Sequence, residues 1–397
     1  MALQSLRPQA GCAFLRPALI ALLSVSIVGC IPRGRTDRPP PPEEQQPVAP
    51  AEDEGPAPSL PADETRNRVA VLVPLSGSNA QIGQAIANAA NLALVDAGGE
   101  RIRITSYDTA QGALVAVNEA LAEGNGLFLG PLLAEDARAI APVARRANVP
   151  VIAFSNDVSV AGNGVYVMGF NPGQSIERVV AYARTRGVGR FGALLPTGVY
   201  GERAGRAYAA AIQRAGGELV AVETYNRTPE TLRAAATRLV ARGQYDAVLI
   251  PDGPRMAALA VPLLRAASPQ LRILGTELWT GETNVGAQAA LRGAWFAGPS
   301  NAMFASLRNR YRARYGANPA RLASLGYDAV LLAVRISADW PLGRPFPARA
   351  LRDEDGFTGV DGAFRFGRDG IAERALEVLE VTATGTTVLS PAPRGFD

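Results

Sequence analysis

From residue 68 onward, short apolar stretches alternate with amphipathic helical stretches, and this alternation constrains the fold more than any other feature of the chain. Short continuous apolar runs are typical of buried strands, and the stretches between them have helical periodicity. The first series comprises strands at Val69–Pro74, Ile102–Tyr107, Gly126–Leu129 and Val149–Phe154, and helices at Ala80–Ala97, Gly112–Glu123 and Ala134–Arg146. Repeated strand–helix units of this kind predict a parallel sheet covered by helices on both faces.

A second series starts after Asn171-Pro172-Gly173, where the proline interrupts the preceding pattern. It comprises helices at Ser175–Arg186, Glu202–Ala215, Thr231–Arg242 and Arg255–Leu264, and strands at Phe191–Leu195, Glu218–Tyr225, Ala247–Pro251 and Leu271–Gly275. The chain therefore predicts two similar α/β lobes. Because ligands bind at the carboxyl ends of parallel strands, we expect a ligand site between the lobes.

Composition is consistent with two domains and gives little support to nucleic-acid binding. The 331 residues from Asn67 to Asp397 are enough for a large core, and 48% of the whole chain is hydrophobic. All 40 basic residues are Arg, but the formal net charge is only +4, and it falls to +2 without Arg7 and Arg16. No dense basic run remains, so we expect no nucleic-acid partner.

The N-terminal segment indicates export and a lipid anchor. An apolar run, Ala18–Val28, is of secretory length but too short to span a bilayer, and it is followed by Gly29 and Cys30. Ile27 to Cys30 resembles the lipobox of bacterial lipoproteins, which implies a signal peptide at residues 1–29 and lipidation of Cys30. An ordinary signal with an incidental cysteine is the alternative. Ile31 follows the cysteine, and the resemblance then implies an outer-membrane anchor facing the periplasm.

Residues 30–66 read as a disordered linker rich in proline and acidic residues. Pro39 to Pro42 form a run of four prolines, and Glu43-Glu44 follows directly. Such a segment cannot bury enough apolar surface to fold and favours an extended conformation. It would lift the globular part off the membrane, or serve only as a solubilising spacer. Since Cys12 and Cys30 are the only cysteines, we expect no disulfide in the folded part.

Several classes of catalytic site are absent from the sequence. The chain contains no histidine, which excludes a Ser-His-Asp triad, a histidine base and a histidine metal site. Residues Gly187 to Gly192 match GxGxxG, but they follow a predicted helix and lead into a strand, which is the reverse of the dinucleotide-binding context. Glu135-Asp136 stand at a helix start, where carboxylates complement the helix dipole. We therefore expect a protein that is not an enzyme and binds neither metal nor cofactor.

Candidate ligand-binding residues follow predicted strands in both lobes. In the first lobe they are Ser76 and Ser78 after the first strand, and Ser155, Asn156 and Asp157 after the fourth. Hydroxyls and backbone N–H groups at a helix start can receive a carboxylate or a sugar oxygen, although a serine there can also simply cap the helix. The second lobe contributes Tyr200, Asp252, Glu277 and Trp279. An aromatic ring beside a carboxylate suits an ammonium group or a sugar face, but each of these residues could equally be a solvated loop residue.

The order of several motifs resembles a known family. The motifs are Val71 to Gly77 (VLVPLSG), Leu129 to Leu132 (LGPL), Val149 to Asn156 (VPVIAFSN), Tyr200-Gly201 and Leu325 to Ala329 (LGYDA). Together they resemble type 1 periplasmic binding proteins of the leucine/isoleucine/valine-binding class. With Gly359 to Gly362 (GVDG), the closest resemblance is to penicillin-binding protein activator lipoproteins. It covers residues 68–390.

The resemblance implies an α/β type 1 periplasmic-binding-protein fold, with two doubly wound parallel-sheet lobes joined by a three-strand hinge. We expect the chain to cross between lobes near Asn171, at Ala297–Ser300 and at Phe364–Gly370. Helices Ala302–Tyr315 and Leu322–Asp339 then belong to the first lobe. The implied lobes are residues 67–170 with 298–365, and residues 171–297 with 366–392.

One departure from the family weakens the case for an amino-acid ligand. Relatives that bind amino acids carry hydroxyl residues after the third and fourth strands, whereas the third-strand loop here reads Pro131-Leu132-Leu133-Ala134. Asp157 in the remaining position would repel a ligand carboxylate. Two functions are therefore expected. The first is an activator of a penicillin-binding protein in peptidoglycan synthesis; the alternative is a solute-binding lipoprotein of an ABC importer for amino acids or another small polar ligand.

Overall fold

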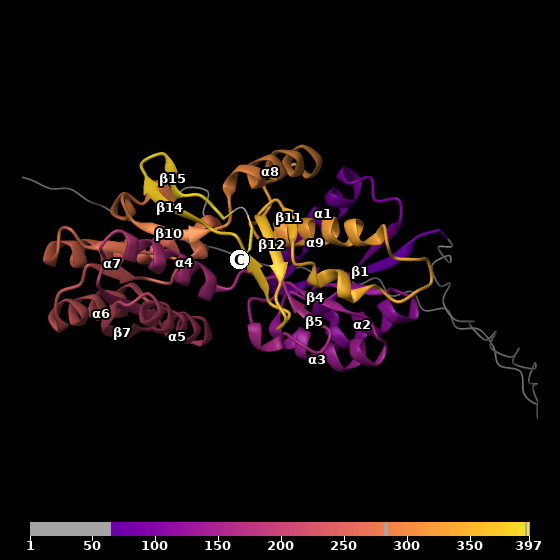
Figure 1. Ribbon diagram of the computed structural model, residues 1–397, viewed down its shortest axis with the longest axis horizontal. Helices are drawn as coiled ribbons and strands as arrows, with labels where there is room; N and C mark the ends of the chain where they lie inside the picture. The colour runs from indigo at the N-terminus through magenta and orange to yellow at the C-terminus, as the bar shows by residue number, and fades with distance from the viewer. Residues whose placement is uncertain (1–64, 282–284, 394, 397) are drawn as a thin grey trace, which may run out of the picture. The chain divides into compact units, whose positions relative to one another are not determined.

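The structure is a computed structural model that describes residues 65–281, 285–393 and 395–396. These residues belong to the same unit of the chain, Pro58–Asp397. The predicted signal peptide, Cys30 and the linker up to Glu64 lie outside the described residues. Two sheets and their covering helices form two lobes, joined by three crossings of the chain (Figure 1).

Lobe 1 is built on a five-stranded sheet of order β2-β1-β3-β4-β5, in which every neighbouring pair is parallel. Its strands are β1 (Asn67–Val73), β2 (Ile102–Asp108), β3 (Leu127–Leu129), β4 (Val151–Ala153) and β5 (Val165–Val167). Its helices are α1 (Ala80–Asp96), α2 (Ala113–Ala122), α3 (Ala134–Arg146), α8 (Asn301–Tyr315) and α9 (Ala323–Ser337). The sheet order reverses between β1 and β3, so the loops after these two strands flank a crevice.

The alternation of side chains along β1 divides the core of lobe 1 into two layers. Val69, Val71 and Val73 pack with α1, α8 and α9 on one face. Ala70 and Leu72 point to the other face and pack with α2 and α3. Both sets are fully buried, because a strand covered on both faces presents apolar side chains in both directions.

Lobe 2 follows the same plan in a seven-stranded sheet of order β15-β14-β10-β9-β8-β6-β7. Its strands are β6 (Arg190–Pro196), β7 (Glu218–Tyr225), β8 (Ala247–Leu249), β9 (Arg272–Leu274), β10 (Trp295–Gly298), β14 (Glu377–Thr382) and β15 (Gly385–Ser390). Helices α4 (Pro172–Thr185) and α5 (Val199–Arg214) cover one face, and α6 (Pro229–Arg242) and α7 (Pro254–Ala267) cover the other. The strands from β7 to β10 are parallel, whereas β14 and β15 are antiparallel additions.

The three crossings lie at residues 168–171, 299–300 and 375–376. Before the third crossing, a small antiparallel sheet is attached to lobe 1. Its strands are β11 (Phe357–Gly359), β12 (Gly362–Phe366) and β13 (Ala372–Arg374). Ile371 bridges in parallel to Val167 at the edge of lobe 1. The structure therefore places the third crossing after the predicted Phe364–Gly370, and residues 366–374 belong with lobe 1.

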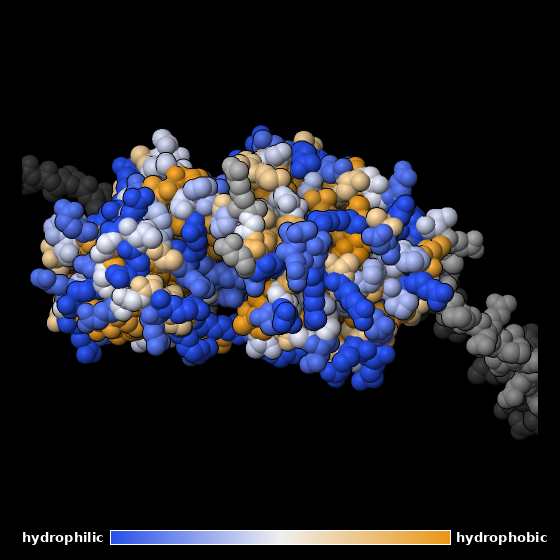
Figure 2. Space-filling view, in the orientation of Figure 1, coloured by the Kyte–Doolittle hydropathy of each residue, from blue (hydrophilic) through white to orange (hydrophobic). Residues whose placement is uncertain are grey.

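The described chain also contains short 3-10 helices in its connections. They are η1 (Gly77–Asn79), η2 (Thr109–Gln111), η3 (Val158–Val160), η4 (Glu277–Gly281), η5 (Val285–Ala287), η6 (Ala289–Leu291) and η7 (Ala348–Arg352). η1, η3 and η4 lie in the connections that follow β1, β4 and β9. Hydrophilic side chains cover much of the visible surface of both lobes, with apolar residues between them (Figure 2).

A close approach of α1 to the end of β1 gives the first testable prediction. Gly83 is buried in α1, and a Cβ atom added there would lie 1.8 Å from the carbonyl oxygen of Pro74. Helix propensity alone favours Gly83→Ala by about 1 kcal/mol, but the clash requires a shift of backbone. We expect Gly83→Ala to lower the free energy of unfolding by about 1–3 kcal/mol, measured by urea denaturation.

Gly253→Ala is the matched control, because nothing lies within 4 Å of a Cβ added at Gly253. As Gly253 is the N-cap of α7, its replacement should cost at most about 1 kcal/mol. If Gly83→Ala stabilises the protein, the close packing of α1 on Pro74 is contradicted.

Candidate functional site

A cavity of about 380 Å³ lies between the lobes. This volume is within the range of small-molecule sites. Lobe 1 lines it with residues of η1, α1, the β3–α3 and β4–β5 loops, the first crossing and the α8–α9 loop, and lobe 2 lines it with residues of η4. The lining residues are Asn79, Ile82, Leu132, Leu133, Phe154, Asn156, Phe170, Glu277, Leu278, Thr280, Gly281, Arg321 and Leu322.

The lobe 1 wall of this cavity is mainly apolar. Leu132 and Leu133 occupy the loop after β3, at the position where the sequence lacks a hydroxyl residue, and both line the cavity. Phe154 and Phe170 add two aromatic rings from the segments that follow β4 and β5. A ligand carboxylate would therefore meet leucine side chains at this end of the sheet.

Of the three predicted residues after β4, only Asn156 lines the cavity. The Ser155 hydroxyl is buried and accepts a hydrogen bond from the backbone N–H of Asp157 (3.0 Å). Asp157 caps η3 by accepting from the backbone N–H of Ser159 (3.0 Å) and from its hydroxyl (2.6 Å). Ser155 and Asp157 thus stabilise their own loop.

Asp157 also binds two arginines, one from each lobe. Arg138 of α3 donates to its carboxylate, and Arg203 of α5 lies 2.7 Å from the same oxygen. Burial by itself raises the pKa of Asp157, but hydrogen bonds from Ser159 and Arg203 outweigh this effect and lower the pKa to about 2. The Asp157–Arg203 ion pair therefore joins lobe 1 to lobe 2 at neutral pH.

The two predicted serines after β1 do not line the cavity. The Ser76 hydroxyl donates to Asp108 Oδ2 (2.6 Å) and accepts from Gln111 Nε2 (3.0 Å). The Ser76 side chain does not cap η1, which excludes the simple capping role. Ser78 is exposed in η1, and its neighbour Asn79 reaches the cavity instead.

In lobe 2, Tyr200 after β6 and Glu277 after β9 are brought together, although β8 lies between these two strands in the sheet. Tyr200 Oη donates to Glu277 Oε1 (2.8 Å), and the Ser175 hydroxyl donates to Glu277 Oε2 (2.5 Å). Burial raises the pKa of Glu277, although both donors act to lower it. Glu277 lines the cavity, yet both of its carboxylate oxygens already accept hydrogen bonds from protein groups.

Asp252 and Trp279 form hydrogen bonds inside lobe 2. The Tyr225 hydroxyl donates to Asp252 Oδ2 (2.8 Å), and Arg227 lies 3.4 Å from the same oxygen. Trp279 is almost fully buried and donates from its indole nitrogen to the Asp252 carbonyl oxygen (2.8 Å). The pair does not line the cavity, so it does not form the expected ammonium or sugar platform there.

The sequence analysis missed most of the lining residues. Ile82, Phe154 and Phe170 lie among ordinary core side chains in the sequence, and Arg321 lies far from the predicted strand ends. Among the lining residues that were not predicted, only Leu132 and Leu133 gave a signal in the sequence, because they depart from the family pattern. The structure thus replaces a polar site with a mainly apolar one, in which Asn79, Asn156 and Thr280 supply uncharged polar groups. The charged side chains of Glu277 and Arg321 also line it and are hydrogen-bonded within the protein.

Two further features of the described residues bear on chemistry. No group of three or more acidic, cysteine or histidine side chains is arranged there to hold a metal ion. None of the helices within the described ranges is both long and apolar enough to cross a membrane.

Comparisons with known proteins bear out the predicted fold. A putative branched-chain amino acid ABC transporter protein of Rhodospirillum rubrum has the same fold, with a TM-score of 0.71 and 20% identity over 82% of this chain and 100% of that one. The C-domain of LpoA from Haemophilus influenzae, described as a regulator of PBP1A, matches with a TM-score of 0.64 and 21% identity over 81% of this chain and 100% of that one.

An uncharacterised protein of Rickettsia prowazekii is 27% identical over 173 residues. This match covers 43% of the chain and 46% of the Rickettsia protein. The family model for periplasmic binding proteins matches residues 67–386, which span both lobes and all three crossings. The chain therefore belongs to the periplasmic binding protein family, with the type 1 fold.

Proposed function

We propose that this chain is a non-enzymatic envelope lipoprotein that regulates peptidoglycan synthesis by binding a penicillin-binding protein. In this proposal Cys30 carries the lipid and the protein faces the periplasm from the outer membrane. The main support is the Asp157–Arg203 ion pair, which joins the lobes at 2.7 Å through side chains of the protein itself. A receptor for polar solutes needs free polar groups at this place, because the ligand has to bridge the lobes.

The hydrogen bonds of the other predicted site residues support the same proposal. The carboxylates of Glu277 and Asp252 accept hydrogen bonds from Tyr200, Ser175 and Tyr225. An amino-acid ligand would have to break these bonds to find a partner for its ammonium group. Partner binding through the outer surface of the lobes makes no such demand on the cleft.

The proposal is tested with the full-length lipidated chain and membranes of its own organism. Penicillin-binding proteins are labelled covalently with a fluorescent penicillin, and the immobilised chain should retain at least one of them. The purified synthase should also polymerise glycan strands faster in the presence of the chain. Leu132→Trp, which fills the cavity, should leave both results unchanged. Absence of any retained labelled synthase, with no change in polymerisation rate, would contradict the proposal.

A second function, binding of a small apolar solute, is favoured by the lining of the cavity. Seven apolar side chains surround it: Ile82, Leu132, Leu133, Phe154, Phe170, Leu278 and Leu322. Asn79, Asn156 and Thr280 can each hydrogen-bond an uncharged polar group. The ligand class is therefore a neutral, mainly apolar molecule, rather than the amino acid expected from the family.

Thermal unfolding with benzamide and leucine as probes separates these ligand classes. Benzamide should raise the melting temperature, because a hundredfold excess over its dissociation constant stabilises the folded protein by about 2.7 kcal/mol. Leucine should have no effect. Leu132→Trp should abolish the benzamide shift, and Leu263→Trp, at a half-exposed position on α7, should retain it. A shift with leucine alone would overturn this ligand class.

Lipidation gives the second testable prediction. In the proposed anchor the thiol of Cys30 takes a diacylglycerol before cleavage frees the amino group for a third acyl chain. Cys30→Ala should therefore lose all incorporation of radiolabelled palmitate in cells and should no longer be processed as a lipoprotein. Cys12→Ala is the control and should be labelled like the unaltered protein. A Cys30→Ala variant that still carries the label would rule out the proposed anchor.

A further inference from the structure

Two sequence motifs that lie apart in the chain come into contact in lobe 1, close to the three crossings. Asp328 of the LGYDA motif lies on α9, and Asp361 of the GVDG motif lies in the turn between β11 and β12. Asp328 Oδ1 accepts the backbone N–H of Val360 at 2.7 Å, and its Oδ2 faces the N–H of Asp361 at 3.4 Å. A Cβ added at Gly359 would lie 2.3 Å from the Asp328 carboxylate, so the turn sits directly against it. The two carboxylates are 1% and 0% exposed.

Two buried arginines of the same region donate hydrogen bonds to the crossings, and one of them also pairs with Asp361. We call Arg321, Asp328, Asp361 and Arg374 the hinge cluster. Arg321 Nη2 donates to Asp361 Oδ1 (2.5 Å), and the same side chain donates to the carbonyl oxygen of Ser300 in the second crossing (3.2 Å). Arg374 Nη2 donates to the carbonyl oxygen of Met168 in the first crossing (2.7 Å). Because Arg374 itself ends β13, just before the third crossing, the hinge cluster contacts all three crossings.

The hinge cluster is incompletely hydrogen-bonded. In the described part of the chain, six buried side-chain atoms lack a hydrogen-bond partner, and four of them belong to this cluster. The four are Asp361 Oδ2, Arg321 Nε, Arg374 Nε and Arg374 Nη1. Unpaired buried polar atoms cost about 1–3 kcal/mol each. The cluster therefore contains one unpaired acceptor and three unpaired donors, and a second arrangement in which they pair would lower this cost.

Arg374 is the group that can make this change. Its Nε and Nη1 form one free edge of the guanidinium, while only Nη2 holds Met168. Arg374 pairs with Phe364 of β12, and this strand begins directly after Asp361, so Arg374 and Asp361 belong to the same small sheet. Turning the free edge toward the two carboxylates would form charge-assisted hydrogen bonds, which are stronger than its bond to a neutral carbonyl. It would also move β13 relative to the first crossing.

We propose that the hinge cluster is a proton-dependent latch of the lobe hinge. When Asp328 is ionised, the free edge of Arg374 turns to the two carboxylates, and β13 shifts the third crossing. When Asp328 is protonated, the described arrangement is retained, with Arg374 on Met168. Asp328 releases its proton to solvent during the change, so the charge of the buried cluster falls from +1 to 0.

The pKa of Asp328 is consistent with this dependence of the two arrangements on pH. Burial and the negative charge of Asp361 raise the pKa of Asp328 to about 7, although the Val360 N–H and Arg374 act to lower it. The α1 residues that pack against this part of α9, such as Ile86, are apolar. An arrangement with a raised pKa is favoured at low pH by linkage. Raising the pH through 7 should therefore move the population toward the arrangement in which Arg374 pairs with ionised Asp328.

The latch is connected to the cavity between the lobes. Arg321 lines that cavity, and the Arg374 guanidinium lies 4.8 Å from the ring of Phe170, which also lines it. A molecule in the cavity would therefore bias the latch through these two side chains. The inference does not depend on the proposed function, because it concerns only the lobe hinge.

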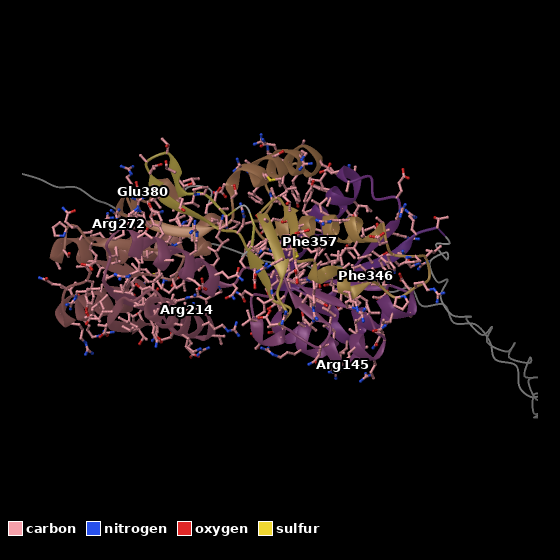
Figure 3. The ribbon with its side chains drawn as sticks, in the orientation of Figure 1. Arg145, Arg214, Arg272, Phe346, Phe357 and Glu380 are labelled. Carbon is pink, nitrogen blue, oxygen red and sulfur yellow. The ribbon has the colours of Figure 1, made fainter. Side chains whose placement is uncertain are left out.

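The test measures the distance between the lobes as a function of pH in the full-length chain. Spin labels are attached through Arg145→Cys on α3 and Arg214→Cys on α5, two exposed positions on different lobes (Figure 3), with Cys12→Ser and Cys30→Ser removing the native thiols. Pulsed electron paramagnetic resonance between pH 5.5 and 8.5 should give two distance populations. The second population should rise with pH, with a midpoint near the pKa of about 7.

The variants decide whether the hinge cluster is responsible. Asp328→Asn cannot ionise, so it should keep the low-pH distance at every pH; Arg374→Gln, which loses the cation, should do the same. The control Asp353→Asn changes an exposed carboxylate that pairs with Arg335, and it should titrate like the parent chain. Distances that do not depend on pH in the parent chain would overturn the proposal, even if no variant folds. A pH-dependent distance that persists in Asp328→Asn would overturn it as well.

Discussion

Asp361→Ala is expected to lower the free energy of unfolding by about 3–5 kcal/mol, because it leaves a buried arginine without its counter-ion. Asp361 is fully buried and forms an ion pair with Arg321, whose side chain is only 7% exposed. The variant would also leave Asp328 as the only carboxylate beside two buried guanidinium groups. Chemical denaturation at pH 7, followed by circular dichroism, measures the loss.

Asp353→Ala is the matched control for this prediction. Asp353 pairs with Arg335 at 3.0 Å, but both side chains are partly or largely exposed. Exposed ion pairs contribute about 0–1 kcal/mol, so this variant should stay close to the parent protein. Equal effects of the two substitutions would show that the hinge cluster is not a buried ionic network.

Stability should fall as the pH rises from about 4 to 7, which is the opposite of the usual acid denaturation. Burial and the charge of Asp361 raise the pKa of Asp328 to about 7 in the folded protein, from an ordinary value of 3.8. Between these two values the folded protein holds a proton that the unfolded chain has lost. The free energy of unfolding therefore decreases by about 1.4 kcal/mol per pH unit, or about 4 kcal/mol at most, and this group contributes no further change above pH 7.

Two other carboxyl groups define the pH window for this measurement. The pKa of Asp157 is lowered to about 2, so its stabilising contribution is complete above its usual pKa and is lost only as the pH falls from there. Burial raises the pKa of Glu277, so this group adds to the decline above its ordinary value of 4.5. Above pH 4.5 the decline therefore contains the contribution of Asp328 together with that of Glu277.

Asp328→Asn isolates the contribution of Asp328, since asparagine resembles the protonated carboxyl group and does not titrate. Denaturation midpoints measured at several pH values should show a much smaller slope than the parent protein. The variant should gain relative stability as the pH rises, and the gain should level off above pH 7. Parallel curves for the two proteins would contradict the raised pKa of Asp328.

The sequence determined the fold of this protein to a large extent. Runs such as Val69–Val73 are apolar at every position, and this pattern predicts a strand covered on both faces, as β1 is. The family motifs, in their order, gave the type 1 fold with two lobes. The sequence analysis missed β5, β10 and the C-terminal strands from β11 to β15. β5 (Val165–Val167), for example, lies in a stretch with glycines at positions 162, 164 and 169, which is typical of a loop.

The candidate site was predicted only in part. The sequence located the strand ends that converge on the cleft, because the carboxyl ends of parallel strands lie at one edge of a sheet. It also showed that Leu132 and Leu133 replace the expected hydroxyl residues, and both line the cavity. It did not show whether the nearby polar side chains are free, since this depends on which partners the fold brings to them.

Tertiary structure alone decided the role of each polar residue. Asp157 and Arg203 are 46 positions apart in sequence, yet they join the two lobes at 2.7 Å. Asp328 and Asp361 each looked like part of a family motif, and only the packing of α9 against the β11–β12 turn makes them neighbours. Local patterns specify strands and helices because backbone preferences and side-chain periodicity act over a few residues. Ion pairs, burial and pKa values depend on contacts between distant segments, and these form only when the chain has folded.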